Sequence, residues 1–128
     1  MDLLALGGER FVSLTTFRRS GTPVATPVWV ARDGGALVVT TPAGSGKVKR
    51  LRRDPRVELR PCDRRGRVRP GAPTATGTAE IVAGAGGDAP TALIRRKYGI
   101  EYRVVMLLER LLVRGPRERV VLRVTPRP

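Results

Sequence analysis

The sequence predicts a mainly β (α+β) fold, a six-stranded antiparallel β-barrel with two or three short helices, as a single domain over residues 1–128. Two observations favour a barrel: alternation of apolar and polar residues recurs from residue 10 to the C-terminus, and tight turns such as Asp33-Gly34-Gly35 join the first strands as a meander. A third observation indicates that the helices are few and short, because the 3.6-residue periodicity of apolar residues is confined to short segments. A chain of 128 residues has room for one hydrophobic core.

Six segments carry the strand pattern: 10–18, 24–31, 36–41, 56–60, 74–82 and 119–125. In the first of them Val12, Leu14 and Thr16 share one face, and in the fourth Val57 and Leu59 are expected to point inward. The helical segments are 47–54, a second one that follows an N-cap at Asp88 and ends at Gly99, and 102–112, which precedes Gly115-Pro116. The arginine-rich and glycine-rich residues 63–72 are expected to form a solvent-facing hairpin loop.

The composition excludes several classes of chemistry. The chain has no histidine and a single cysteine, Cys62, so it has no imidazole base, no internal disulfide and no Cys-cluster or His-ligated metal site. No apolar run approaches the ~20 residues of a membrane span. We therefore expect a cytoplasmic protein without a metal. The formal charge of +14, from 25 basic and 11 acidic residues, predicts an anionic partner.

The segment SGKVKRLRRDPRVELRPC, residues 45–62, raises the question of which anion that partner is. A helix start favours acidic residues, yet this helix places Lys47, Lys49 and Arg50 in its first turn. Backbone N–H groups freed by Gly44 and Gly46, the Ser45 hydroxyl, and Lys47 and Arg50 one turn apart would together form a phosphate cradle. A basic helix that is simply solvated is the alternative, and the sequence leaves both open.

Nucleic acid is the rival anion, because residues 47–69 hold eleven basic and three acidic residues. The run is interrupted by Val48 and Leu51 in register for burial, so most of it is expected to fold. Aromatic residues that would stack on bases number only five in the whole chain. We expect nonspecific binding at low salt and no dedicated nucleic-acid function.

A second informative stretch is Ala25-Thr26-Pro27-Val28-Trp29. A proline inside a β run has to lie at a sheet edge or where the ladder opens. Pro27 and Trp29 would there offer backbone amides and a flat apolar surface to a planar ring. A core tryptophan beside a bulge explains the same pattern.

Together these residues resemble a known family. FVSLTTFRRSGTPVATPVWVARDGGALVVTT, followed by SGKVKRLRRDPRVELRPCDRRGR, is similar to the pyridoxamine 5'-phosphate oxidase-like (PPOX class) proteins, whose fold is the FMN-binding split β-barrel. The similarity covers residues 10–82 and is greatest to the branch of coenzyme F420-dependent oxidoreductases. KYGIEYRVVMLLERL resembles the helical insert of one subgroup.

The resemblance implies a homodimer with a deazaflavin, coenzyme F420, at each subunit interface, and hydride transfer to a small organic acceptor. By position it assigns Thr26, Pro27, Val28 and Trp29 to the ring, Thr40 and Thr41 to the ribityl chain, and Ser45, Gly46, Lys47 and Arg50 to the phosphate. The catalytic residues stay unknown; Asp63 and Tyr98 are the only candidate proton donors. An FMN-binding oxidase on the same barrel is the alternative, and the missing histidine argues against pyridoxamine phosphate oxidase activity itself.

Overall fold

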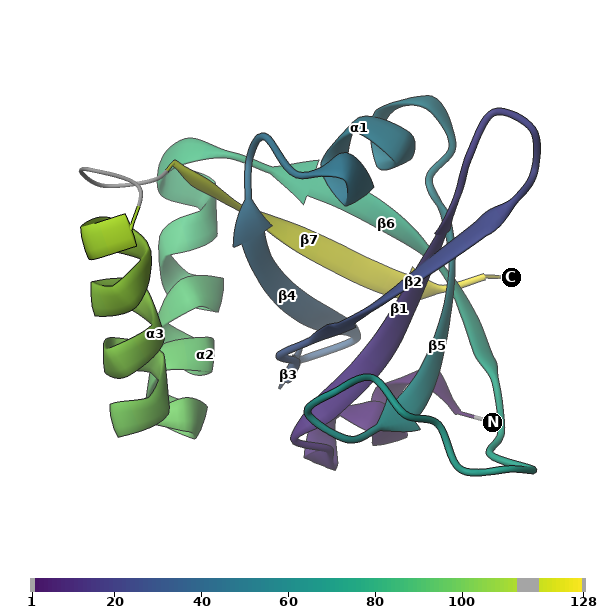
Figure 1. Ribbon diagram of the computed structural model, residues 1–128, viewed down its shortest axis with the longest axis horizontal. Helices are drawn as coiled ribbons and strands as arrows, with labels where there is room; N and C mark the ends of the chain where they lie inside the picture. Colours follow the sequence, from purple (N-terminus) through teal and green to yellow (C-terminus); the bar gives the residue numbers. More distant parts are fainter. Residues whose placement is uncertain (1, 113–117, 128) are drawn as a thin grey trace.

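The computed structural model describes residues 2–112 and 118–127, and its elements are shown in Figure 1. Within these residues the elements are, in chain order, η1 (Leu3–Gly8), β1 (Phe11–Phe17), β2 (Pro23–Val28), β3 (Ala31–Asp33), β4 (Ala36–Pro42), α1 (Gly46–Arg53), β5 (Arg56–Cys62), β6 (Ala75–Val82), η2 (Gly84–Gly87), α2 (Asp88–Tyr98), α3 (Ile100–Leu112) and β7 (Arg119–Pro126), where η marks a 3₁₀ helix. The predicted mainly β (α+β) class is confirmed.

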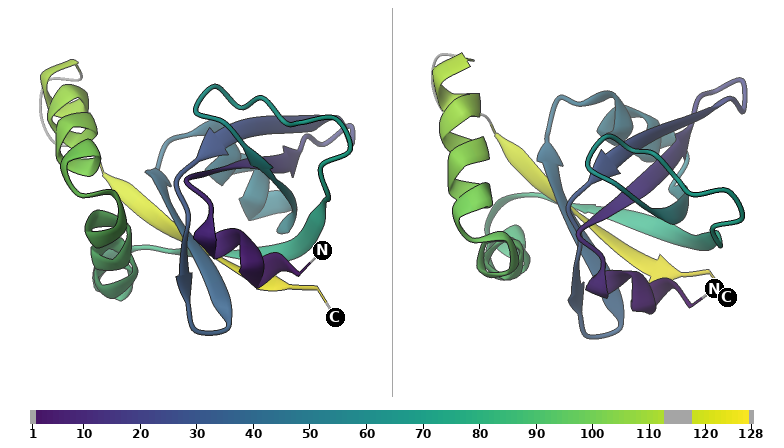
Figure 2. Two further views of the ribbon diagram at one scale, coloured as in Figure 1. Left: turned by 90° about the horizontal axis from the view of Figure 1, so that it is seen from below. Right: turned by 60° about the horizontal axis from the view of Figure 1, so that its bottom comes forward.

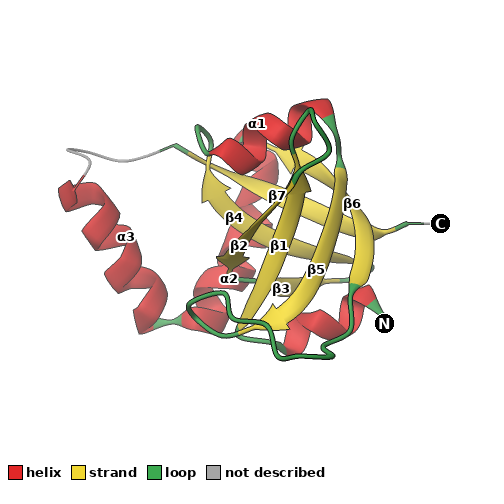
Figure 3. Cartoon of the chain, turned by 45° about the vertical axis from the view of Figure 1, so that its right-hand side comes forward, coloured by secondary structure: helices red, strands yellow, loops and turns green. Residues whose placement is uncertain are grey.

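The strands form one antiparallel sheet in the order β2-β1-β5-β6-β7-β4-β3. The two edge strands, β2 and β3, are consecutive in the chain and separated only by Trp29 and Val30. Such a link spans at most about 10 Å between the flanking Cα atoms, so the sheet has to curl until its edges come close. Figure 3 shows the result, a barrel in which the two edge strands, β2 and β3, are not paired with each other.

The described residues contain seven strands and not the six of the predicted barrel, because the predicted strand 24–31 is divided at the Trp29–Val30 link. Pro27 lies opposite Ser13 in β2, which is an edge strand. A missing N–H is tolerated at an edge, and the expectation for this proline is therefore confirmed.

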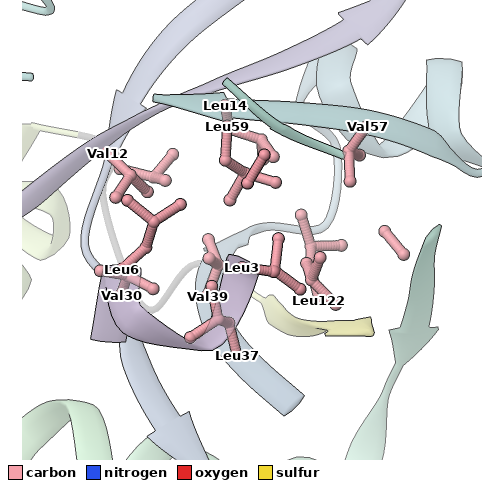
Figure 4. Packing of buried hydrophobic residues seen from close by; sticks show 14 of the residues in the cluster. Leu3, Leu6, Val12, Leu14, Val30, Leu37, Val39, Val57, Leu59 and Leu122 are labelled. Atoms are coloured by element: carbon pink, nitrogen blue, oxygen red, sulfur yellow. The ribbon is translucent and has the colours of Figure 1, made fainter. Parts of the chain in front are cut away.

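The barrel interior is filled by the inward face of each strand, as Figure 4 shows for Val12, Leu14, Leu59 and Leu122. The inward positions predicted for Val57 and Leu59 are confirmed, since both are fully buried. η1, which the sequence did not predict, closes one end of the barrel with Leu3 and Leu6. α1 closes the opposite end through Val48 and Leu51.

α2 covers the outside of the barrel over β3, β4 and β7. Ile94 and Tyr98 of this helix pack against Val38 and Val121, which point away from the barrel interior. β4 is therefore buried on both faces, and this includes the polar side chains of Thr40 and Thr41. Figure 2 shows α2 and α3 together on one side of the barrel.

The predicted helices are present with small shifts of their ends. α1 begins at Gly46, α2 begins at Asp88 with Gly87 as its N-cap, and α3 begins directly after Gly99. Asp88 is thus the first residue of α2 and not its cap. The predicted loop after residue 62 connects the antiparallel pair β5 and β6. Gly115-Pro116 lies outside the described residues.

The C-terminal end of α2 holds the strand link through Lys97. Its Nζ donates hydrogen bonds to the carbonyl oxygens of Gly7 at 2.9 Å, Glu9 at 2.5 Å and Val30 at 2.6 Å. Burial, with a contribution from the charge of Arg10, lowers the pKa of Lys97. This ammonium group joins three segments that are distant in the sequence.

Tyr98, the next residue, bonds to the same link. Its hydroxyl donates to the carbonyl oxygen of Arg10 at 2.7 Å and accepts from the backbone N–H of Val30 at 3.0 Å. Burial raises the pKa of Tyr98, so the hydroxyl keeps the proton that the first bond needs. The Trp29–Val30 link is therefore fixed by side chains of α2.

We predict that Lys97→Met lowers the free energy of unfolding by about 3 kcal/mol, because three carbonyl oxygens lose their donor. Urea denaturation measures the loss. Arg96→Met is the matched control, since Arg96 is exposed on the same helix and its replacement should leave stability within about 0.5 kcal/mol. Equal losses in the two variants would contradict the role of Lys97.

Candidate functional site

A cleft of about 200 Å³ opens beside the Trp29–Val30 link. It is lined by Phe11 of β1, Pro27 and Val28 of β2, Trp29 of the link, Thr40, Thr41 and Pro42 of β4, Lys47 of α1, Val105 and Glu109 of α3, and Arg119 of β7. A second hollow of about 370 Å³ shares Glu109 and Arg119 with this cleft. The cleft thus joins apolar ring surfaces, threonine hydroxyls and charged groups from six elements.

Six of the ten residues that the sequence assigned to the cofactor line this cleft: Pro27, Val28, Trp29, Thr40, Thr41 and Lys47. Ser45 and Arg50 lie next to the lining residues. The Ser45 hydroxyl is 3.4 Å from that of Thr41, and the charge of Arg50 acts on Lys47. The structure therefore brings together segments that are about twenty residues apart in the sequence.

Thr26 lies on the same face of β2 as Val28, one of the lining residues. Its Oγ1 is buried, and among the described residues it has no hydrogen-bond partner. Buried hydroxyls in folded proteins are nearly always paired. Thr26 itself does not line the cleft, so its buried hydroxyl faces the barrel side of β2 and not the open space of the cleft.

The start of α1 keeps its backbone N–H groups open. Ser45 is the N-cap residue, yet its side chain makes no capping hydrogen bond, and no acidic residue stands in the first turn of this fully described helix. A Cβ at Gly46 would lie 2.8 Å from Nη1 of Arg50, so the glycine leaves room for the guanidinium over the first turn. The helix start can bind an anion, because its N–H groups and positive dipole end carry no internal partner.

Two cations beside this helix start are held by threonines. Lys47 Nζ donates to Oγ1 of Thr41 at 3.2 Å, and Arg50 Nε donates to Oγ1 of Thr16 at 2.7 Å. Burial lowers the pKa of Lys47, and the charges of Arg50 and Arg119 lower it further. A neutral or cationic ligand would leave the repulsion among these three positive charges in place, whereas an anion would relieve it.

Arg119 and Glu109 also line the cleft, and sequence reasoning missed both. Arg119 donates to Oγ1 and to the carbonyl oxygen of Thr40, each at 3.1 Å. Its Nη1 donates to both carboxylate oxygens of Glu109, at 2.8 and 2.6 Å. No local signal marks these two residues, because they lie in an amphipathic helix and at the start of a strand, and only the tertiary structure brings them together.

Trp29 is held on several sides by other residues. Its ring stacks on Tyr98 at a centroid distance of 5.0 Å and lies tilted against Tyr102 at 5.8 Å. Its Nε1 donates to Glu101 at 3.2 Å. Both interpretations of this tryptophan therefore apply in part: it packs as a core residue beside a break in the strand, and it lines the cleft.

Glu101, in the first turn of α3, connects this tryptophan to the charged surface. Its carboxylate accepts from Arg64 at 2.8 Å and from Arg10 at 3.3 Å, and only 17% of its side chain is exposed. Burial alone would raise its pKa, but the hydrogen bond and charge of Arg64, the charge of Arg10 and the bond from Trp29 hold the pKa of Glu101 below its usual range. The loop after β5 is thereby tied to the start of α3.

Neither candidate proton donor lines the cleft. The Asp63 carboxylate accepts from the backbone N–H groups of Arg65 at 2.9 Å and Arg67 at 2.8 Å, which makes it a turn residue of the loop after β5. The Tyr98 hydroxyl is committed to the strand link. Among the described residues, no group of three or more carboxylate, thiol or imidazole side chains could hold a metal.

Comparison with protein-family models identifies the class. The model described as pyridoxamine 5'-phosphate oxidase matches residues 4–127, so the chain belongs to this family of split β-barrel proteins. Among curated proteins no match was found. Of the helices that the structure describes, none has the length and apolar character needed to cross a membrane.

Solved structures with the same fold bind different groups. An F420 Reductase is 23% identical, with a TM-score of 0.63 over 97% of this chain and 92% of that one. A FAD-binding protein from Mesorhizobium loti is 15% identical, with a TM-score of 0.67 over 96% and 83%. The heme storage protein HutZ from Vibrio cholerae is 12% identical, with a TM-score of 0.67 over 94% and 84%. At these identities the likeness establishes the fold.

We predict that the environment of Trp29, the one tryptophan of the chain, changes as Glu101 is protonated. Because the folded-state pKa of Glu101 is depressed, its contacts contribute stability above the ordinary glutamate pKa of about 4.3 and lose it as pH falls through the lower folded-state value. Tryptophan fluorescence, followed from pH 7 down to about 3 while circular dichroism remains native, should show this transition. Glu101→Gln should abolish it and Glu80→Gln should keep it; an unchanged profile in Glu101→Gln would contradict the assignment.

Proposed function

We propose that this protein is an oxidoreductase that binds coenzyme F420 and transfers hydride between this deazaflavin and a small organic acceptor. The observation that carries the proposal is the group of cations at the start of α1, Lys47 and Arg50, which lack an acidic partner in the described residues and adjoin the cleft beside Trp29. A cofactor phosphate supplies the negative charge that this helix start lacks.

The residues present fit such a cofactor. Ser45, Gly46, Lys47 and Arg50 would hold the phosphate, and Thr40 and Thr41 would lie along the ribityl chain. Thr26, Pro27, Val28 and Trp29 would border the ring. Pro27, Val28, Trp29, Thr40, Thr41 and Lys47 line one cleft, and this supports the placement.

The bound deazaflavin would supply the hydride chemistry, and the chain would position it. The stacking of Trp29 on Tyr98 and its bond to Glu101 make the wall of the cleft rigid. Pro27, exposed at the edge of the sheet, offers a flat apolar surface without a backbone donor. No catalytic acid or base is assigned to the described residues, so solvent is the proposed source of protons.

An FMN-binding oxidase is the alternative, because FMN carries a phosphate that the same helix start would bind. The exposed arginines favour coenzyme F420, whose glutamate tail is absent from FMN. Arg65 and Arg67, both exposed in the loop after β5, offer charge to such a tail. Titration with both cofactors, followed by ligand fluorescence at two salt concentrations, separates the alternatives. If neither cofactor binds while a random DNA duplex does, the basic residues form a polyanion-binding surface and the proposal is wrong.

We also propose that the functional unit is a homodimer in which α3 contacts the second copy. The cleft of about 200 Å³ is smaller than the ~300–1,000 Å³ of typical ligand sites, so a further wall is needed to enclose a three-ring system. α3 borders the cleft with Val105 and Glu109, while none of its thirteen described residues is buried. Its exposed apolar residues are Ile100, Val104, Leu107, Leu108, Leu111 and Leu112. A second copy seated on this face would bury them and supply the wall.

We predict that Lys47→Ala combined with Arg50→Ala weakens binding of coenzyme F420 about 100-fold or more, because two charge-assisted hydrogen bonds to the phosphate are lost. The fluorescence titration measures this. Lys49→Ala combined with Arg52→Ala is the matched control, since both residues are exposed on the same helix and carry the same charge. Equal effects of the two double variants would mean that the helix acts through its total charge and not through a phosphate site.

We predict that Leu107→Glu combined with Leu111→Glu makes the protein monomeric and weakens cofactor binding, because two carboxylates would enter the apolar contact. Size-exclusion chromatography with light scattering measures the mass. Ser20→Glu combined with Thr22→Glu adds the same charge in an exposed turn and should leave the dimer intact. A wild-type protein that is monomeric at high concentration would refute the dimer.

A further inference from the structure

We propose that Arg119 is a third cation of the anion site and that Glu109 is its built-in counter-ion, which an anionic ligand group replaces. This inference concerns the same cleft and rests on the proposed function for the identity of the cofactor, but the anion exchange itself can be tested without any cofactor. It adds a specificity-determining pair that neither the sequence pattern nor the family match assigns.

Arg119 is positioned like a binding residue. Its Nε and Nη2 donate hydrogen bonds to Thr40, and these bonds fix the guanidinium plane against β4. The remaining nitrogen, Nη1, points to the carboxylate of Glu109. Only 19% of the Arg119 side chain is exposed, and its charge acts on the half-buried ammonium group of Lys47. Arg119 and Lys47 therefore present positive charge to the same space.

Glu109 is the one carboxylate among the described residues that line the cleft. Both of its oxygens accept from the single nitrogen Nη1 and not from two parallel nitrogens of the guanidinium. A carboxylate or phosphate oxygen approaching through the cleft would make the same kind of contact with Nη1. Glu109 thus occupies a position that an external anion could take.

The attachment of Glu109 to the protein makes this exchange feasible. α3 has no buried residue in its described length. Its hydrogen bonds, ion pairs and aromatic contacts to other elements involve Glu101 and Tyr102 at one end and Glu109 near the other. A carboxylate on such a helix can leave Arg119 by rotation of its own side chain, without unpacking a core. By contrast, Arg119 begins β7 opposite Pro42 of β4 and remains in place.

The exchange would make the cleft selective for charge. A neutral ligand cannot replace the carboxylate, because Arg119 would then lose its partner in a half-buried position. An anion replaces one ion pair by another and in addition relieves the crowding at Lys47. The cost of breaking the Glu109 contact lowers the affinity of the wild-type protein for every anion, and removing that carboxylate should raise the affinity.

Calorimetric titration with inorganic pyrophosphate at constant ionic strength tests the proposal. Glu109→Gln should bind pyrophosphate about fivefold more tightly than the wild type, and Arg119→Gln about tenfold more weakly. In the variant that carries both changes, Glu109→Gln should give no gain over Arg119→Gln alone. Glu80→Gln is the control, because this substitution removes the same charge at a residue that is exposed on β6 and does not line the cleft.

Three results would overturn the proposal: unchanged or weaker pyrophosphate binding by Glu109→Gln, an equal gain in Glu80→Gln, or no effect of Arg119→Gln. If circular dichroism shows that Arg119→Gln does not fold, Arg119→Lys replaces it and should still lower the affinity, because an ammonium group lacks the planar fork that bonds to Thr40 through Nε and Nη2 while Nη1 faces the anion. Titration with coenzyme F420 and FMN is read separately. Failure of both cofactors to bind would refute the proposed function, while the pyrophosphate series decides the role of Glu109.

Discussion

The two-residue link between the edge strands is the constraint on which the remaining structure depends. Trp29 and Val30 join β2 to β3, the opposite edges of the sheet, so the sheet has to curl around the core. Lys97 and Tyr98 hold this link by hydrogen bonds to Val30 and to the segment before β1. The same bonds set Trp29 against the aromatic side chains of α2 and α3 and thereby shape the cleft beside it.

Positive charge at the start of α1 is the second constraint. Lys47 and Arg50 are drawn toward the threonines of β4 and β1, and burial makes their mutual repulsion more costly than it would be in water. Folding tolerates this arrangement because α1 also buries Val48 and Leu51 in the barrel. An anion at this helix start would lower the cost, which is why a charge pattern that is unfavourable in the isolated chain supports the proposed ligand site.

The barrel by itself does not decide the cofactor. Structures with this fold include an F420 Reductase, a FAD-binding protein and a heme storage protein. What differs between such proteins has to lie in the side chains that line the cleft and in the segments that border it. In this chain those segments are the start of α1 and the helix α3, which borders the cleft and leaves its apolar residues exposed.

The sequence by itself determined the strands, the three helices and the anomalous charge at residues 47–50, because these depend on local periodicity, turn residues and helix polarity. It also indicated Pro27 as an edge residue. Only the tertiary structure decided the division of the second strand, the orphaned hydroxyl of Thr26 and the pairing of Glu109 with Arg119. The physical reason is that each of these depends on groups brought together by packing, and packing leaves no periodic trace in the sequence.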